Sequence, residues 1–204
     1  MVAVRICFLG DSLTNGTGDT GYLGWTGRVC ATAAERGHDI THYNLGIRRE
    51  TSAEIARRWL AEATPRLVPG PHAPAPFDGR LVFAFGNNDA VIDAGARRMS
   101  VEETLAAATE MLTSAKRLYP TLCIGPAPSA DPEHTTRVLA LSDALGPCCA
   151  AIGVPYLAVA KYLSETPAWM DGVRNGDGAH PPAAGYVAFA KLVEAWPAWR
   201  AWLP

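Results

Sequence analysis

One serine, one histidine and one aspartate stand in positions that suit nucleophilic catalysis. Ser12 follows an apolar run, with only a glycine and an aspartate between them. His180 stands three residues after Asp177 in a loop rich in glycine and proline, so the carboxylate can hold one imidazole nitrogen while the other faces outward. A serine hydroxyl is a poor nucleophile at neutral pH and needs such a base. These three side chains are therefore candidates for acyl transfer.

Each of these residues also has an ordinary structural interpretation. Glycine, aspartate and serine are common turn residues, and a histidine ahead of a proline at a helix start is often a surface or capping residue. The functional interpretation depends on whether the chain can bring the three side chains together.

Alternating strand-like and helix-like segments predict a framework that can do so. This order is typical of a parallel sheet with right-handed crossovers and helices on both faces. We expect a single α/β domain over residues 1–204: a three-layer α/β/α sandwich, flavodoxin-like, with a five-stranded parallel sheet. The expected strands are residues 4–9, 40–45, 81–85, 121–124 and 154–159. The expected helices are residues 22–36, 51–63, 100–118, 132–152 with a break near 146–147, and 182–195.

The strand ends in this framework gather polar residues at one edge of the sheet. Ser12, Gly46 and Asn88 each follow or border a strand's carboxyl end, where open α/β sheets bind their ligands. The late loop that carries Asp177 and His180 should face the same edge. Nucleophile, base, acid, backbone donors and a side-chain amide then lie together, which is the set that acyl transfer requires.

Four short blocks, in this order, resemble the SGNH or GDSL hydrolase family: residues 10–13 (Gly-Asp-Ser-Leu), Gly46, residues 86–89 (Gly-Asn-Asn-Asp) and residues 177–180 (Asp-Gly-Ala-His). The resemblance implies that Ser12 is the nucleophile, His180 the general base and Asp177 its orienting acid. It also implies an oxyanion hole made by the backbone N–H groups of Ser12 and Gly46 and the side chain of Asn88. Asp11, Asn87 and Asp89 are expected to shape the corners through local backbone hydrogen bonds.

The resemblance implies a serine esterase that hydrolyses carboxylic esters, with short-chain acyl or acetyl esters favoured and no cofactor required. Lysophospholipid, thioester and carbohydrate acetyl hydrolysis stay open, as does a non-enzymatic ligand-binding module. Substrate-pocket candidates, chosen for adjacency to the four blocks, are Leu13, Asn15, Tyr22, Arg48, Ala90, Val91 and Ala179.

Composition argues against several other classes. A net charge of −2 suggests no nucleic-acid partner, and no apolar run is long enough to cross a membrane, so we expect a cytoplasmic protein. No cysteine or histidine cluster shows metal-ligand spacing, and the five cysteines are expected to be reduced. Residues 16–21 fit a dinucleotide-binding glycine pattern, but they begin seven positions after the strand ends, which disfavours that function.

Three features are left with structural interpretations. Residues 64–80 hold five prolines and are expected to form a long surface loop. The three C-terminal tryptophans favour a tail docked on its own domain, with a subunit contact or a substrate-facing role as alternatives. If the chain forms an oligomer, residues 64–80 and the tryptophan-bearing C-terminus are the two expected contact surfaces. The remaining histidines, His38, His42, His72 and His134, are expected to be solvent-facing or helix-end residues.

Overall fold

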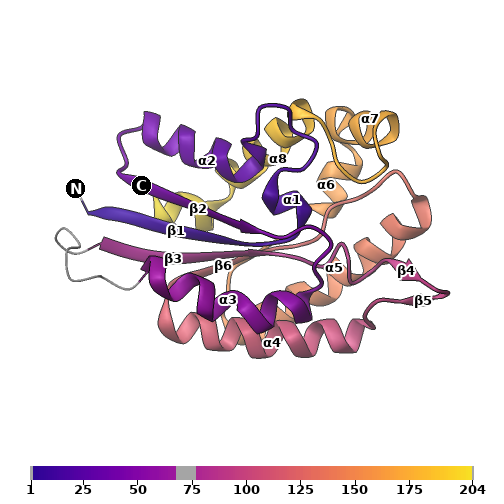
Figure 1. Cartoon of the computed structure of the whole chain (residues 1–204), viewed down its shortest axis with the longest axis horizontal. Coiled ribbons are helices and arrows are strands. Elements are labelled where there is room, and N and C mark those ends of the chain that lie inside the picture. The colour runs from indigo at the N-terminus through magenta and orange to yellow at the C-terminus, as the bar shows by residue number, and fades with distance from the viewer. Residues whose placement is uncertain (1, 68–76, 204) are drawn as a thin grey trace.

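The computed structural model describes residues 2–67 and 77–203. Five parallel strands form one sheet in the order β2-β1-β3-β6-β7 (Figure 1). The strands are β1 (Ala3–Gly10), β2 (Ile40–Gly46), β3 (Phe77–Ala84), β6 (Thr121–Ile124) and β7 (Tyr156–Leu157). Together with the helices on both faces, this sheet confirms the predicted α/β architecture.

The helices cover the sheet in two layers. Helices α3 (Ser52–Leu67), α4 (Val101–Leu118) and α5 (Pro132–Ile152) lie on one face. The other face carries α2 (Gly24–Glu35), α7 (Pro167–Asn175), α8 (Ala183–Ala195) and α9 (Pro197–Trp202), with the short α1 (Ser12–Asn15) and α6 (Ala160–Ser164) near the strand ends (Figure 1).

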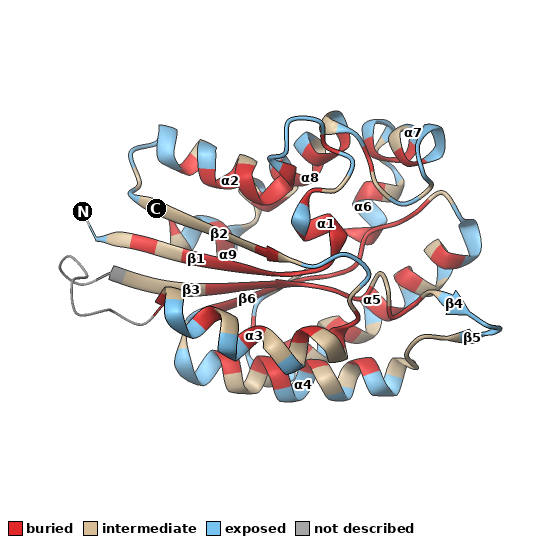
Figure 2. Cartoon of the chain, in the orientation of Figure 1, coloured by how far each residue is buried: buried red, intermediate tan, exposed pale blue. Residues whose placement is uncertain are grey.

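Strand β1 is buried on both faces, as the apolar run predicted. Successive side chains of a strand point to opposite faces. Accordingly Ile6 and Phe8 enter the core beneath α2 and α8, whereas Cys7 and Leu9 enter the core beneath α3 and α4. Figure 2 shows this interior strand as mostly buried between helices whose outer faces are exposed.

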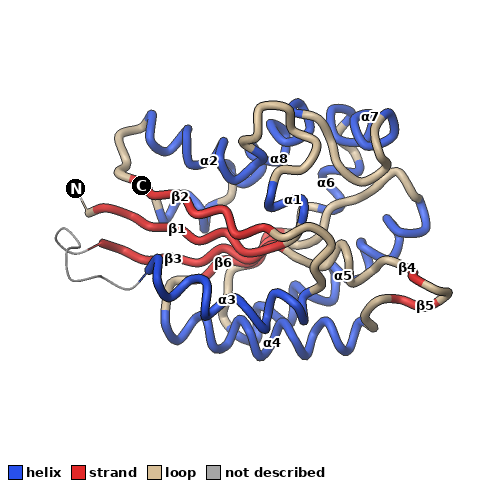
Figure 3. Tube along the Cα trace, in the orientation of Figure 1, coloured by secondary structure: helices blue, strands red, loops and turns tan. Residues whose placement is uncertain are grey.

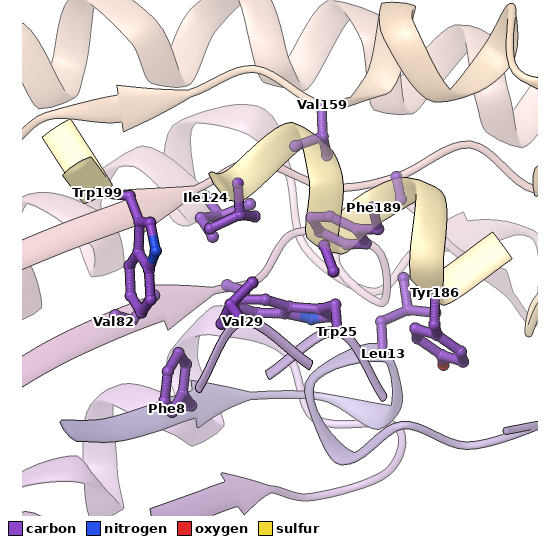
Figure 4. Close-up of a cluster of buried hydrophobic side chains, with 14 of the residues drawn as sticks. Phe8, Leu13, Trp25, Val29, Val82, Ile124, Val159, Tyr186, Phe189 and Trp199 are labelled. Atoms are coloured by element: carbon purple, nitrogen blue, oxygen red, sulfur yellow. The ribbon is translucent and has the colours of Figure 1, made fainter. Parts of the chain in front are cut away.

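Aromatic rings dominate the core on the α2 and α8 side (Figure 4). Trp25 stacks on Phe189 at 5.1 Å between ring centroids, and Phe8 meets Trp25 edge to face at 5.5 Å. The C-terminal Trp199 joins this core and is only 3% exposed, with Trp202 beside it. The tail is therefore docked on its own fold, as favoured from the tryptophan spacing.

Several element boundaries differ from the sequence predictions. Helix α3 continues through Pro65 to Leu67 and β3 already begins at Phe77, so the loop expected over residues 64–80 is shorter at both ends. The rest of that predicted loop lies outside the described residues. Strand β7 has two residues instead of six, and α7 takes the first part of the loop expected over residues 171–182.

Helix α5 has no break at Gly146-Pro147. A proline removes one intrahelical hydrogen bond, but Leu145 and Cys149 on either side of Pro147 are fully buried against the sheet. Tertiary packing therefore keeps the helix continuous. The capping box predicted at Ser100 and Glu103 is confirmed at the start of α4.

A short antiparallel pair, β4 (Ile92–Asp93) and β5 (Ala96–Arg97), was not predicted and projects beyond the carboxyl ends of the sheet (Figure 1). The five cysteines are free, and four of them are buried. Within residues 2–67 and 77–203, no helix is long and apolar enough to span a membrane.

Candidate active site

The loops that follow the strands gather at one end of the sheet (Figure 3). Residues Gly10, Gly46 and Ala84 are paired in register, so β1, β2 and β3 end at the same level. A β-carbon on Gly10 would lie 2.3 Å from the carbonyl oxygen of Ala84, so only glycine fits at this strand end. The chain can therefore turn sharply from β1 into α1.

Ser12 is the first residue of α1 and is 8% exposed. Asp11 caps this helix, because its Oδ1 accepts a hydrogen bond from the N–H of Leu13 at 2.9 Å. This local bond agrees with the corner-shaping role expected for Asp11. Since a helix's first N–H groups have no intrahelical acceptor, the N–H of Ser12 is left unpaired among the described hydrogen bonds.

The structure brings Ser12, His180 and Asp177 into one hydrogen-bonded chain. The Nε2 atom of His180 lies 2.7 Å from Ser12 Oγ, and its Nδ1 lies 2.6 Å from Asp177 Oδ2. The other carboxylate oxygen of Asp177 accepts from the backbone N–H groups of Ala179 and His180 at 3.0 and 2.8 Å. Residues 168 positions apart in the sequence are thus in direct contact.

Asp177 is held in its ionised form. Partial burial raises the pKa of its carboxyl, but the hydrogen bonds from His180 and Ala179 outweigh burial and lower the pKa to about 2. An ionised Asp177 accepts a hydrogen bond from Nδ1–H, which leaves Nε2 of a neutral His180 as the acceptor facing the hydroxyl of Ser12.

Asn88 lies next to Ser12's corner. Its side-chain Nδ2 donates to the carbonyl of Glu50 at 2.9 Å and, more weakly, to Asp11 Oδ2 at 3.3 Å. Asp11 is fully enclosed, and burial, with a smaller contribution from the nearby Asp89 charge, raises the pKa of its carboxyl to about 7. The two hydrogen bonds to Glu50 and Asp11 orient the amide of Asn88 toward the strand ends.

The prediction that Gly46 supplies a free backbone donor is wrong. Its N–H donates to the side-chain Oδ1 of Asn44 at 3.0 Å, and Gly46 does not line the cavity that contains Ser12. An asparagine side chain commonly bonds to the backbone two residues on, and this local turn occupies the donor.

Arg49 takes an unexpected position in the same loop. Its φ angle is +70°, a conformation that residues with a β-carbon seldom adopt, and such strain is frequent at functional sites. Arg49 lines the Ser12 cavity together with Asn88. The hydrogen bonds of the described residues include none from its backbone N–H. Sequence patterns give no signal for this residue, because nothing local marks a non-glycine with positive φ.

The remaining corner residues make long-range contacts, which corrects the expectation of local ones. The buried carboxylate of Asp89 accepts hydrogen bonds from the N–H and hydroxyl of Ser52, and from the Thr104 hydroxyl at 3.1 Å. The side chain of Asn87 pairs with both backbone groups of Ala127, donating at 2.6 Å and accepting at 3.0 Å. These bonds tie the corner after β3 to α3, α4 and the loop after β6.

His134 lies at the start of α5, which agrees with the helix-end alternative, but its burial and its two partners were not expected. Its side chain is buried in the first turn of α5, with Nε2 2.9 Å from the carbonyl of Asn87 and Nδ1 3.0 Å from the hydroxyl of Ser129. Burial lowers the pKa of this imidazole. The neutral ring then donates to Asn87 and accepts from Ser129, and it lines the cavity beside Ser12. His42, expected to be a solvent-facing or helix-end residue, instead lies half-buried in β2 and contacts the hydroxyl of Thr26 at 3.1 Å.

A small cavity of about 110 Å³ opens above Ser12. Of the predicted pocket residues, Leu13, Arg48, Val91 and Ala179 line it, whereas Asn15, Tyr22 and Ala90 do not. The described residues contain no cluster of three His, Cys, Asp or Glu side chains that could hold a metal ion.

Residues 8–188 match the model of the GDSL-like lipase/acylhydrolase family. The chain belongs to this family. It is a hydrolase that acts on ester bonds. As expected for a GDSL-like enzyme, its small-molecule substrate is an ester. A search of curated proteins finds no match by sequence.

Solved structures share the fold of this GDSL-like chain at low sequence identity. The lipase/acylhydrolase from Enterococcus faecalis is 23% identical, with a TM-score of 0.69 and coverage of 95% of this chain and 93% of the other. Axe2, an acetylxylan esterase from Geobacillus stearothermophilus, is 17% identical, with a TM-score of 0.70 and coverage of 92% and 91%. LAE5, an α/β hydrolase from the metagenome of Lake Arreo in Spain, is 18% identical, with a TM-score of 0.74 and coverage of 98% and 97%.

Proposed function

We propose that the protein is a serine esterase that hydrolyses short-chain carboxylic esters through an acyl-enzyme. The observation that carries this proposal is the continuous hydrogen-bonded chain from Asp177 through His180 to Ser12. A hydroxyl, an imidazole and an ionised carboxylate in this order have the geometry of an activated nucleophile.

In the proposed first step, Ser12 Oγ forms a bond to the ester carbonyl carbon while His180 Nε2 takes the hydroxyl proton. The carbon–oxygen bond to the alcohol then breaks, and His180 returns the proton to the departing oxygen. A water molecule repeats the sequence on the acyl-enzyme, releasing the carboxylic acid and regenerating Ser12. Asp177 orients the imidazole and stabilises its charged form throughout.

The negative oxygen of each tetrahedral intermediate needs preorganised donors, each contributing about 3 kcal/mol to catalysis. Three groups beside Ser12 fit this role: its own N–H, the N–H of Arg49 and the amide of Asn88. The amide already has two acceptors, and we assign the longer bond, to Asp11 at 3.3 Å, as the one that yields to the oxyanion. Arg49 thus takes the place first expected for Gly46.

The size of the cavity supports a short acyl group. At about 110 Å³, the space above Ser12 is well below the roughly 300 Å³ at which drug-sized ligands begin to fit. Acetyl and other short acyl chains suit it better than long lipid chains. The acetylxylan esterase with a similar fold is consistent with an acetyl group but does not identify the alcohol.

The proposal is tested by initial hydrolysis rates on p-nitrophenyl esters from acetyl to dodecanoyl, for the parent and a folded Ser12→Ala variant. We expect a short-chain optimum and a loss of roughly 10⁵-fold or more in the variant. Equal rates in both proteins would show that Ser12 is not the nucleophile. An optimum at dodecanoyl would contradict the assigned acyl cavity.

A further inference from the structure

A second, larger cavity of about 340 Å³ adjoins the one above Ser12. The two cavities share four lining residues, Val91, Ser129, His134 and Ala179, so they form one continuous depression at the end of the sheet. The larger cavity extends between the base of the projecting β4-β5 pair and the start of α5. If the acyl group fills the small cavity above Ser12, the alcohol part of the ester must lie in this larger space or in a neighbouring one.

The proposed reaction indicates which part of the ester enters it. The departing oxygen must lie within hydrogen-bond reach of His180 Nε2 to receive the proton. The alcohol therefore leaves along the segment that carries His180, and residues 177–179 form one wall of the larger cavity. A third cavity is lined by Asp177 and His180, but His180 is the one residue that it shares with the Ser12 cavity. The larger cavity is thus the better-connected route for the alcohol.

Arg137 supplies hydrogen-bond donors to this cavity. Its side chain is 16% exposed and anchored by a bond from Nε to the carbonyl of Ala90 at 2.8 Å. Its terminal nitrogens lie 3.8 Å from Asp131 and 3.9 Å from Glu133, beyond hydrogen-bond distance. Among the described residues, no hydrogen bond is made by these two nitrogens. The guanidinium is therefore fixed in place with donors still available.

The charges around the cavity disfavour an anionic alcohol. Its lining includes the carboxylates of Asp131 and Asp177 against the single guanidinium of Arg137, and His134 is a neutral ring. A purely apolar alcohol is also disfavoured, because it would cover these polar groups without satisfying them. Val91 and Ile92 add one apolar wall. The lining combines donors, acceptors and an apolar surface.

We propose that this cavity binds the alcohol part of the ester and selects an uncharged alcohol with several hydroxyl groups, with Arg137 as the specificity-determining residue. Arg137 donates to the hydroxyl oxygens, and Asp131 accepts from the hydroxyl hydrogens. This assignment rests on the proposed esterase function and adds the chemical class of the leaving group.

The test compares acetate esters that differ only in the alcohol: ethyl acetate, hexyl acetate, glycerol monoacetate and a monoacetylated methyl pyranoside. We expect kcat/KM to be highest for the two hydroxylated esters. In Arg137→Met, which keeps an unbranched apolar stem but removes the donors, their kcat/KM should fall about 10- to 100-fold. Ethyl acetate should change by less than about threefold, which also shows that the variant is folded.

Two control variants make the outcome specific. Arg174→Met removes an exposed arginine that lines neither cavity, and it should leave all four substrates unchanged. Asp171→Ala alters the third cavity, which Asp171 lines. The inference is overturned if hexyl acetate is preferred, if the preference for hydroxylated esters survives in Arg137→Met, or if Asp171→Ala abolishes it instead. In each of these cases Ser12-dependent hydrolysis of ethyl acetate still separates this failure from failure of the esterase proposal.

Discussion

The two halves of the site are built in opposite ways. The half that carries Asp177 and His180 is a surface loop, in which the aspartate side chain is 55% exposed and the hydrogen bonds that its carboxylate accepts come from within three residues. The half that carries Asn88 is more enclosed, with Asp89 buried and Asn87 and Asn88 half-buried, and Asn87 and Asp89 reach segments 15 to 40 positions away.

Because of this difference, the surface loop contributes mainly to catalysis, whereas the corner after β3 also contributes to the stability of the fold. The surface loop organises itself through short-range bonds and adds little to the core, so its side chains are free to serve the reaction. The corner after β3 is held by several elements at once, so it contributes both to the fold and to the position of the oxyanion donor. Substitutions in the two halves should therefore have different signatures.

The largest effect is expected for Asp177→Asn. This change keeps the side chain's shape but removes the charge that orients His180, so kcat should fall by roughly 10⁴-fold. The free energy of unfolding should change by less than about 1 kcal/mol, because the residue is exposed. Steady-state kinetics and urea denaturation measure the two quantities. A fully active variant would mean that another acid holds the imidazole.

Asp89→Ala should behave in the opposite way. It leaves the N–H and hydroxyl of Ser52 buried without the carboxylate acceptor, whereas the hydroxyl of Thr104 keeps the carbonyl of Ser100 at 3.0 Å. We expect a loss of about 3 kcal/mol in the free energy of unfolding. Urea denaturation of this variant beside Asp177→Ala tests the contrast, and equal stability losses would abolish it.

His134→Phe should lower kcat by about 10- to 100-fold with little change in KM. The ring holds the carbonyl of Asn87, and a small displacement of the next residue, Asn88, would misplace its amide. His38→Phe, at the far end of β2, serves as a control. Because His134 is expected to act through Asn88, the effects of His134→Phe and Asn88→Ala should not add in the double variant. Additive effects would point to a separate structural role.

The smallest effect concerns Asp11 and pH. Burial raises the pKa of its carboxyl from 3.8 to about 7, so the folded state holds a proton that the unfolded state loses between these values. The parent should therefore lose stability relative to Asp11→Asn as pH rises from about 4 to 7. We expect a relative change of at least about 1 kcal/mol between pH 4.5 and 8. A constant difference across this range would contradict the assigned pKa.

The sequence predicted best what is local or periodic. The buried strand β1, the capping box of α4 and the spacing between Asp177 and His180 each depend on neighbouring residues, and the structure has the strand, the box and the Asp–His contact. The convergence of Ser12 and His180 followed from the parallel sheet, because its strand ends share one edge.

Features that depend on distant partners were missed. The burial of His134 requires α5 to pack beside the corner after β3, and no residue near His134 in the sequence indicates that packing. The positive φ of Arg49 is fixed by the loop's surroundings. Gly46 is different, since Asn44 two residues earlier was a readable signal that its N–H could be occupied. Assigning the roles of the site residues therefore requires the long-range contacts of the structure as well as the sequence motif.

Covalent labelling tests most directly whether Ser12 is the nucleophile. The purified protein is treated with diethyl p-nitrophenyl phosphate, released p-nitrophenol is counted, and the site of phosphorylation is located by peptide mass spectrometry. We expect one equivalent of p-nitrophenol, an adduct on Ser12, loss of esterase activity in step with labelling, and much slower labelling in His180→Ala. An adduct on another residue such as Ser129, with Ser12 unmodified in the inactivated protein, would contradict the assignment of Ser12 as the nucleophile.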